Sequence, residues 1–165
     1  MAGLLVAGAC SAGPATAPTV TTAATGSVTP EGFAATRARV TAADGEVCEL
    51  CVWVADTTER RARGLMGVTD LGAAEAMAFV YPGPTSTAFW MFSTPMPLSI
   101  AFFDPVGTWL DDFDMTPCAD HPCASYATPD GFSVALEVPA GGLADLLVGP
   151  GSTFALLDLP CEPGG

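Results

Sequence analysis

The 165-residue sequence contains no lysine and only one histidine, and its five basic residues are all arginines. Eighteen acidic residues oppose them, which gives a formal net charge of −13 at pH 7. Phosphate backbones and anionic lipid surfaces repel so acidic a chain, which argues against nucleic-acid binding and against docking on a membrane through a basic face. Long apolar runs are missing too, since none approaches the roughly 18 residues that a membrane-spanning helix needs. Half of the residues are nevertheless hydrophobic, so one packed domain is expected.

The N-terminus has the layout of a bacterial lipoprotein signal. The short apolar stretch Leu4–Val6 is followed by small residues and then by Cys10, although no basic residue precedes the stretch. We predict that residues 1–10 are a truncated signal segment and that Cys10 is lipidated; a chance cysteine is the alternative. The protein would then be exported and lipid-anchored on the outer face of the cytoplasmic membrane, or periplasmic or extracellular. Residues 11–32 are predicted as a flexible Ala/Thr/Pro linker, 33–161 as a single globular domain and 162–165 as a disordered tail.

Six cysteines lie at positions 10, 48, 51, 118, 123 and 161. If Cys10 carries lipid, five remain, and at least one of them cannot pair within the chain. Cys118 and Cys123 bracket a short proline-containing loop and are predicted to form a local disulfide. The CxxC spacing of Cys48 and Cys51 falls in a predicted strand, where the two side chains point to opposite faces. A structural disulfide between Cys51 and Cys161 is therefore favoured over zinc binding or a redox dithiol.

The chain alternates short β-prone segments with turn residues. A short helix is predicted between the N-cap residues Asp56-Thr57 and Gly64, and another over 142–147. Two β-prone runs joined by the turn 104–107 predict a hairpin over 98–115. The remaining predicted strands span residues 33–41, 47–55, 75–81, 88–92, 132–138 and 152–159. The strands are too frequent for a helix between each pair, so we predict a β-rich α+β domain: a small, mostly antiparallel sheet or barrel-like domain with two short helices.

Three segments, in this order, resemble the family known as domain of unknown function 192. They are VADTTERRARGLMG (54–67), AFWMFSTPMPLSIAFFD (88–104) and a third segment over 115–126 that begins with MTPC and ends with a further Cys and a Tyr. The third is followed by ALEVPAGGLADLLVGPGS (135–152). The resemblance covers the whole domain and implies a small, mostly β fold that is often exported and has no established activity. Two positions depart from the family pattern: Ser93 replaces the usual Asn, and Ser99 replaces the usual Asp. A serine cannot replace a carboxylate as an acid–base catalyst, which counts against such chemistry at these positions.

We predict an exported, non-catalytic binding or accessory domain whose ligand is an unknown small molecule or envelope component. Arg60 and Arg63 share a helix face and could hold a carboxylate or phosphate, or simply pair with neighbouring acidic residues. Trp90 and Met91 point to opposite sides of a strand, so one should enter the core while the other lines a surface or groove. An exposed Trp90, flanked by Tyr81 and by Phe89 or Phe92, could stack on a sugar or peptide; plain core packing is the alternative. The predicted ligand-binding residues are Arg63, Gly64, Leu65, Met66, Phe89, Trp90 and Met91.

Three alternatives remain open. A cell-envelope hydrolase acting on carbohydrate or peptide would need carboxylates such as Glu75, Asp104 or Glu137 to converge in one cleft, or would use His121, although no nucleophile elbow is present. A structural envelope module would have neither a carboxylate cleft nor an apolar groove. A weak metal binder could use Asp111, Asp112 and Asp114 for calcium, with Asp104 and Asp120 nearby in the sequence. Copper could instead be held by methionines 66, 77, 91, 96 and 115 with His121 and the thiols of Cys118 and Cys123. We favour an acidic edge strand and core-filling methionines, and predict a monomer with no catalytic residue, metal or cofactor.

Overall fold

The structure is a computed structural model that describes residues 8–9 and 28–161. Within these residues it contains one α-helix, α1 (Thr58–Arg63), and one 3-10 helix, η1 (Ala144–Leu146). The strands are β1 (Gly8–Ala9), β2 (Ala34–Thr41), β3 (Val47–Ala55), β4 (Ala76–Thr85), β5 (Phe89–Trp90), β6 (Leu98–Phe103), β7 (Trp109–Met115), β8 (Ser125–Tyr126), β9 (Phe132–Pro139) and β10 (Thr153–Pro160). No helix of these residues is both long and apolar enough to cross a membrane.

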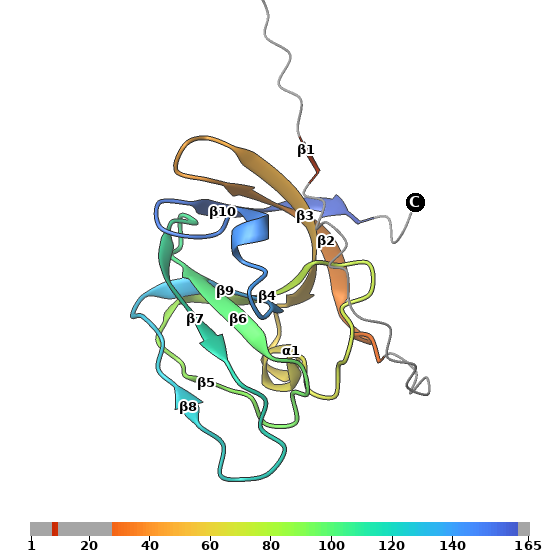
Figure 1. Ribbon diagram of the computed structural model, residues 1–165. Helices are drawn as coiled ribbons and strands as arrows, with labels where there is room; N and C mark the ends of the chain where they lie inside the picture. The colour runs from red at the N-terminus through yellow and green to blue at the C-terminus, as the bar shows by residue number, and fades with distance from the viewer. Residues whose placement is uncertain (1–7, 10–27, 162–165) are drawn as a thin grey trace, which may run out of the picture.

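The strands form one curved sheet with the order β10-β2-β3-β4-β9-β6-β7, and β1 pairs with β3 beside this path (Figure 1). The pairing is antiparallel except for β3 with β4 and β1 with β3. A separate two-stranded arm, β5 with β8, projects from the lower end of the domain in Figure 1. The predicted β-rich, mostly antiparallel class is therefore confirmed.

The predicted barrel-like closure is wrong. Edge strands β7 and β10 do not form a ladder, and the edges meet only through an isolated bridge between Thr108 and Thr153. The backbone N–H of Phe154 donates to the carbonyl oxygen of Gly107 at 2.8 Å, beside this bridge. The sheet thus curls far enough for its edges to touch at one corner and stays open elsewhere.

The second predicted helix is also wrong, because residues 142–147 form only the three-residue 3-10 helix η1. Glycines at 141 and 142 disfavour a helix before this segment, and Leu147 ends it with a left-handed φ of 62°. The predicted strand over 88–92 is shortened to β5 for a similar reason, since Ser93 turns the chain with a φ of 53°. In contrast, β4 continues to Thr85 through two prolines, with a shift in register after Val80.

Apolar groups cover both faces of the sheet, and this burial determines the surroundings of the candidate site. One core cluster contains Leu50 and Val52 of β3 and is closed by η1 and β10; the other contains Met77, Phe79 and Phe102 beneath α1 and the β5 segment. Strand β9 is central and is buried on both faces. A charged residue in β9 is therefore removed from water whichever face it occupies.

The two predicted disulfide pairings are present, Cys51 with Cys161 and Cys118 with Cys123. None of the described cysteines is free, Cys48 included, so the unpaired thiol expected from the count is not found among them. Cys10 lies outside the described residues. So do residues 162–165 and most of the predicted linker, but residues 28–32 lie against the domain: Val28 exchanges hydrogen bonds with Thr69.

Candidate functional site

The first wall of the site is the turn that ends α1. The helix begins as the N-cap residues predict, since the Thr57 hydroxyl accepts a hydrogen bond from the Arg60 N–H. It ends at Gly64, whose φ of 47° suits glycine and whose missing side chain lets the turn lie against Phe79; a Cβ there would be 3.1 Å from the ring. Leu65 is buried beneath this turn. The local sequence thus fixes residues 63–66 against the β4 side of the sheet.

A cavity of about 480 Å³ lies between this turn and the β5 segment. Six of the seven predicted ligand-binding residues line it: Arg63, Gly64, Leu65, Met66, Phe89 and Trp90. Met91 does not, because it points into the core and is only 1% exposed. Trp90 on the opposite side of the strand is 50% exposed, which is the predicted division between the two side chains. Two segments far apart in the sequence therefore meet at one hollow.

Glu137 of β9 also lines the cavity. Its neighbours across the sheet are Met77 on β4 and Ile100 on β6, both fully buried, and Glu137 itself is 4% exposed. No hydrogen bond or ion pair to its carboxyl group is found among the described residues. Burial raises the pKa of Glu137 from its ordinary value near 4.5 to about 8. Its carboxyl group is therefore mostly neutral at pH 7.

Two arginines line the α1 side of the cavity. Arg61 donates from Nη1 to the carbonyl oxygens of Asp56 and Val80, both at 2.7 Å, and its guanidinium carbon lies 4.8 Å from the centre of the Tyr81 ring. Arg63 stacks over Phe33 at 4.3 Å and donates from Nη2 to the carbonyl oxygen of Glu31. Tyr81 lines the cavity as well, and burial raises the pKa of its hydroxyl.

Arg60 behaves differently from these two arginines. It pairs with the Asp56 carboxylate at 2.7 Å, and its hydrogen bond lowers the pKa of Asp56. The alternative of simple pairing with a neighbouring acid therefore holds for Arg60 and not for Arg63, which contacts a backbone oxygen and a ring instead.

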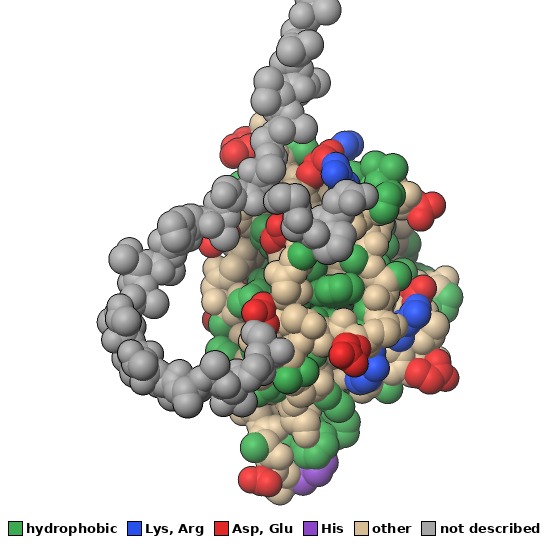
Figure 2. All heavy atoms as spheres, turned by 90° about the vertical axis from the view of Figure 1, so that its right-hand side faces the viewer, with side chains coloured by type: hydrophobic (Ala, Val, Ile, Leu, Met, Phe, Trp, Pro, Cys, Tyr) green, Lys and Arg blue, Asp and Glu red, His purple; other side chains and the backbone are tan. Residues whose placement is uncertain are grey.

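An aromatic cluster of Trp90, Phe92 and His121 lies beside the cavity. The His121 ring stacks on Phe92 with centres 4.1 Å apart, and Trp90 lies 5.7 Å from His121. Figure 2 places the histidine at the lower tip of the molecule, next to hydrophobic side chains. His121 is exposed and faces aromatic rings, so the arrangement does not provide the Ser-His-Asp geometry of a hydrolase.

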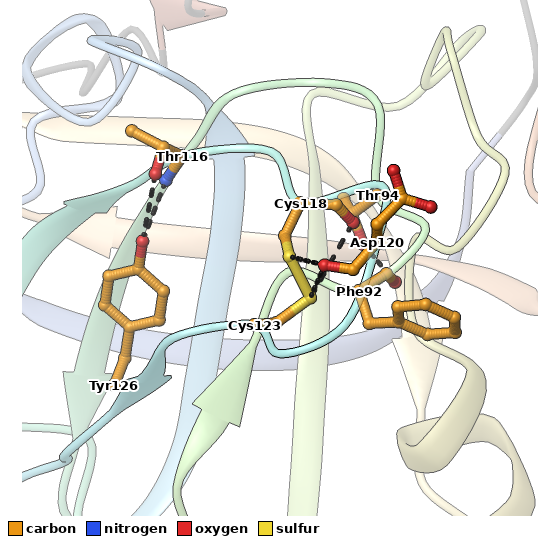
Figure 3. Close-up of a disulfide and its surroundings, with 7 residues drawn as sticks. All are labelled: Phe92, Thr94, Thr116, Cys118, Asp120, Cys123 and Tyr126. Carbon is orange, nitrogen blue, oxygen red and sulfur yellow. Dashed lines mark hydrogen bonds between the residues drawn. A yellow bond between two sulfur atoms is a disulfide. The ribbon is translucent and has the colours of Figure 1, made fainter.

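The loop that carries His121 is held from both ends (Figure 3). The Cys118–Cys123 disulfide closes it, the Cys118 N–H donates to the Met91 carbonyl oxygen, and the Cys118 carbonyl oxygen accepts from the Ser93 N–H. Beyond the loop, the Tyr126 hydroxyl accepts a hydrogen bond from the Thr116 N–H at 3.1 Å. These contacts fix the β5–β8 arm, and with it Trp90, to the end of the main sheet.

The other candidate carboxylates do not reach the cavity. Glu75 accepts a hydrogen bond from the Cys51 N–H at 2.7 Å, and Asp104 accepts from the N–H groups of Val106 and Thr108 in the β6–β7 turn. The carboxylate cleft that a two-acid hydrolase needs is therefore not formed by Glu75, Asp104 and Glu137. The three aspartates considered as calcium ligands, Asp111, Asp112 and Asp114, lie on β7, at the edge of the sheet.

No group of three or more His, Cys, Asp or Glu side chains in the described part of the chain is arranged to hold a metal ion. Three of the five methionines considered for copper, Met77, Met91 and Met115, are buried core residues. The thiols of Cys118 and Cys123 are joined in a disulfide rather than available as ligands.

The two serine departures have structural explanations. Ser93 lies at a φ of 53°, a conformation in which Asn is favoured over most residues, so an Asn there is suited to the turn itself. Ser99 is 2% exposed; its hydroxyl donates to Asp114 and accepts from the Gly141 N–H at 2.8 Å. Neither residue lines the cavity.

The fold and the cavity together define a class of protein, a small β-rich domain whose open, mostly antiparallel sheet carries a hollow on one face. The chain belongs to the family DUF192, described as "Uncharacterized ACR", whose family model matches residues 39–156. The family resemblance seen in the sequence is thereby confirmed. No curated protein matches the chain.

Solved structures of similar proteins include the following two. A Sinorhizobium meliloti 1021 protein, provisionally described as a transcription regulator, is 26% identical with a TM-score of 0.68; the match covers 79% of this chain and 98% of that one. A protein of unknown function from Novosphingobium aromaticivorans DSM 12444 is also 26% identical, with a TM-score of 0.61, and the match covers 72% of this chain and 83% of that one.

Sequence reasoning placed Tyr81 beside Trp90, but it did not single out Arg61 from the arginine run and did not assign Glu137 to the ligand site. A signal for Glu137 exists, because it is the only charged residue in the apolar strand FSVALEVP. Such a residue is expected to be exposed when one face of a strand meets water. Glu137 is buried because other parts of the chain cover both faces of β9.

Proposed function

We propose that this chain is an exported binding domain, lipid-anchored through Cys10, and that the cavity between residues 63–66 and β5 is its ligand site. The observation that carries the proposal is the meeting of Gly64, Leu65, Phe89 and Trp90 around one cavity, although these residues come from separate segments of the chain. Ligand sites are typically concave and mostly apolar, with a few polar groups that fix orientation. Aromatic walls with an arginine side and one acid fit this description.

The cavity supports binding rather than two-acid hydrolysis. Glycosidases of the common type use two carboxyl groups on either side of the bond that is broken. Here Glu137 is the only carboxyl group among the described lining residues. The two disulfides of the described residues suit a protein that works in an oxidising compartment, which supports export.

The site can be tested with benzyl alcohol, an uncharged aromatic probe, in an NMR titration of the full chain. The three tryptophans supply internal controls. Trp53 donates its indole N–H to Leu71 and Trp109 donates to Asp112, away from the cavity lining, whereas Trp90 lines the cavity. We expect the probe to shift the Trp90 indole signal and the amides of residues 63–66, and to leave the other two indole signals in place.

Two variants, each with one exposed alanine replaced by phenylalanine, control this titration. Ala88 is exposed and lines the cavity, so Ala88→Phe should fill the entrance and reduce the shifts. Ala73 is also exposed and lies outside the lining, so Ala73→Phe should leave the titration unchanged. Shifts spread over all three indoles, or unaffected by Ala88→Phe, would contradict a ligand site at this cavity.

A further inference from the structure

The charges around the cavity are unusual for this protein. Eighteen acidic residues outnumber five arginines, so each arginine has many possible carboxylate partners. Arg39 pairs with Glu49 and Arg60 pairs with Asp56. Arg61 and Arg63, which line the cavity, form no ion pair with a described carboxylate. Arg37, outside the cavity, is likewise without an ion pair among the described residues, and the Asp56 carboxylate acts on Arg61 at longer range. What distinguishes the cavity is that two arginines without an ion-pair partner line one hollow of a strongly negative molecule.

Arg61 is held in a way that suits an anion receptor. Both of its hydrogen bonds in the described part of the chain come from Nη1, and its guanidinium carbon lies over the Tyr81 ring. The backbone carbonyls of Asp56 and Val80 position the group without neutralising it. Nε and Nη2 remain as donors, and a guanidinium fixed beforehand loses little side-chain entropy when it binds a carboxylate or phosphate.

The acid in the cavity does not cancel this positive charge. Burial keeps Glu137 mostly neutral at pH 7, and a neutral carboxyl group can donate a hydrogen bond to an acceptor on a ligand. The other titratable groups that line the cavity are Arg61 and Arg63 on the α1 side and Tyr81 on β4; the lining residues from β5, Phe89 and Trp90, carry none. At neutral pH the lining is therefore cationic and aromatic, with one acid that can act as a donor.

We propose that the cavity binds a small organic anion with an aromatic or apolar body, whose carboxylate or similar group pairs with Arg61. The body of the ligand then lies against Phe89 and Trp90, and Glu137 donates a hydrogen bond from within the cavity. This inference rests on the proposed function, because it names the class of ligand for the same site. A cationic ligand, held by ionised Glu137 inside the aromatic walls, is the opposite assignment.

Three probes of similar shape separate these assignments: benzoate, benzylamine and benzyl alcohol, which are negative, positive and neutral near pH 6.5. Titrated into the full chain by NMR, benzoate should bind about tenfold more tightly than either of the others, because it alone gains a charge-assisted pair with Arg61. Raising the pH to about 9.5 ionises Glu137, and the like charge should weaken benzoate binding by about tenfold. Benzylamine loses much of its own positive charge at about pH 9.5, so its affinity is compared between about pH 6.5 and pH 8.5, where it should move in the opposite direction.

Matched variants test the two residues. Arg61→Gln should reduce benzoate affinity by about tenfold, whereas Arg60→Gln, on the same helix and outside the lining, should leave it unchanged. Glu137→Gln should still bind benzoate at pH 6.5 and should lose the decrease at high pH. The wild-type probe and pH series requires no variant, so it holds even if Arg61→Gln proves unstable.

The outcomes distinguish the two proposals. If none of the three probes shifts Trp90 and residues 63–66, the ligand site itself is wrong. If benzyl alcohol binds as tightly as benzoate, or Arg61→Gln has no effect, the cavity binds ligands and the anion assignment is overturned. If benzylamine binds more tightly than the other two probes and its affinity rises with pH, the cavity prefers cationic ligands and the anion assignment is likewise overturned.

Discussion

At the scale of single residues, Gly107 holds one corner of the sheet. It occupies the β6–β7 turn at a φ of +87°, and a Cβ there would overlap the carbonyl oxygen of Phe154 on β10. Gly45, in the β2–β3 turn, has a φ of +89° and open space around it. Both donate a hydrogen bond to the carbonyl oxygen three residues earlier, at 2.9 Å. The two glycines therefore share a backbone conformation, but only Gly107 lies close to another strand, at the carbonyl oxygen of Phe154.

We expect Gly45→Ala to lower the free energy of unfolding by about 1 kcal/mol, the cost of a left-handed alanine. Gly107→Ala should cost about 2 kcal/mol more, because the turn must also move away from β10. Urea unfolding of both variants measures the difference. Equal losses would mean that the contact between Gly107 and Phe154 does not stabilise the fold.

Glu137 should make the stability of the domain depend on pH. Its pKa is about 8 in the folded state and near 4.5 when exposed, so the unfolded chain releases this proton first as the pH rises. The contribution of Glu137 is therefore most favourable below about pH 4.5, and it is lost as the pH rises through 8.

The neutral variant Glu137→Gln isolates this effect. Its free energy of unfolding relative to wild type should increase by about 1.4 kcal/mol per pH unit between pH 5 and 8, measured by urea unfolding at each pH. Glu59→Gln, at an exposed position on α1, controls for the loss of one negative charge. A difference between wild type and Glu137→Gln that does not change with pH would show that Glu137 ionises in the folded protein as it does in the unfolded chain.

Residues of the candidate site could be predicted from the sequence when they belong to a local signal. Gly64 follows an N-capped run of arginines, which predicts the end of a helix. Trp90 and Met91 are adjacent in a predicted strand, which predicts that their side chains point to opposite sides. Glu137 and Arg61 could not be predicted in this way, because their roles depend on what covers β9 and on which backbone carbonyls lie near α1. Burial by distant segments leaves no local pattern in the sequence.

At the scale of elements, the hairpin over β6 and β7 was the best predicted part of the fold. Asp104 supports its turn with two side-chain hydrogen bonds to backbone N–H groups, which is why the tetrapeptide 104–107 was a strong signal. The arm strands β5 and β8 have only two residues each and depend on contacts with the Cys118 loop. Elements this short are fixed by tertiary contacts, so propensity alone could not give their ends.

The two disulfides should contribute unequally to stability. Cys51–Cys161 joins β3 to the residue after β10 across a sequence separation of 110, whereas Cys118 and Cys123 are five residues apart. Loop-closure entropy predicts a loss of about 5 kcal/mol for Cys51→Ser with Cys161→Ser and about 2 kcal/mol for Cys118→Ser with Cys123→Ser. Urea unfolding of the two double variants tests this order.

The short disulfide should matter more for the site than for the fold. Removing it frees the loop that holds His121 against Phe92, close to Trp90. The Cys118/Cys123 double variant should therefore change the near-ultraviolet circular dichroism of the aromatic cluster with little loss of far-ultraviolet signal. Equal destabilisation by the two double variants would contradict the loop-length argument.

At the scale of the whole molecule, the acidic surface and the disulfides are both compatible with life outside the cytoplasm, and the predicted lipidation at Cys10 connects them. In such a maturation a diacylglyceryl group from a membrane phospholipid replaces the thiol hydrogen of Cys10, and a peptidase then hydrolyses the Ala9–Cys10 bond, which releases residues 1–9. Two signals are usually needed for stable anchoring, and a lipoprotein cysteine supplies more than one acyl chain. A domain that captures a soluble ligand would thereby be held at the membrane without a spanning helix.

Intact mass spectrometry of the natively expressed protein, before and after reduction and alkylation, is the direct measurement. We expect a chain that begins at Cys10, carries a diacylglyceryl-type mass increment and gains alkyl groups at Cys51, Cys118, Cys123 and Cys161 only after reduction. Cys48 is not free in the structure either, so its alkylation before and after reduction is scored separately, and a disulfide found between Cys48 and Cys10 would exclude lipidation. Cys10→Ser should abolish the increment and release the protein from the membrane fraction, while benzyl alcohol should still shift Trp90. A chain that retains residues 1–9 without lipid, with the four thiols reduced, would overturn the exported and anchored assignment while leaving the cavity to be judged on its own titrations.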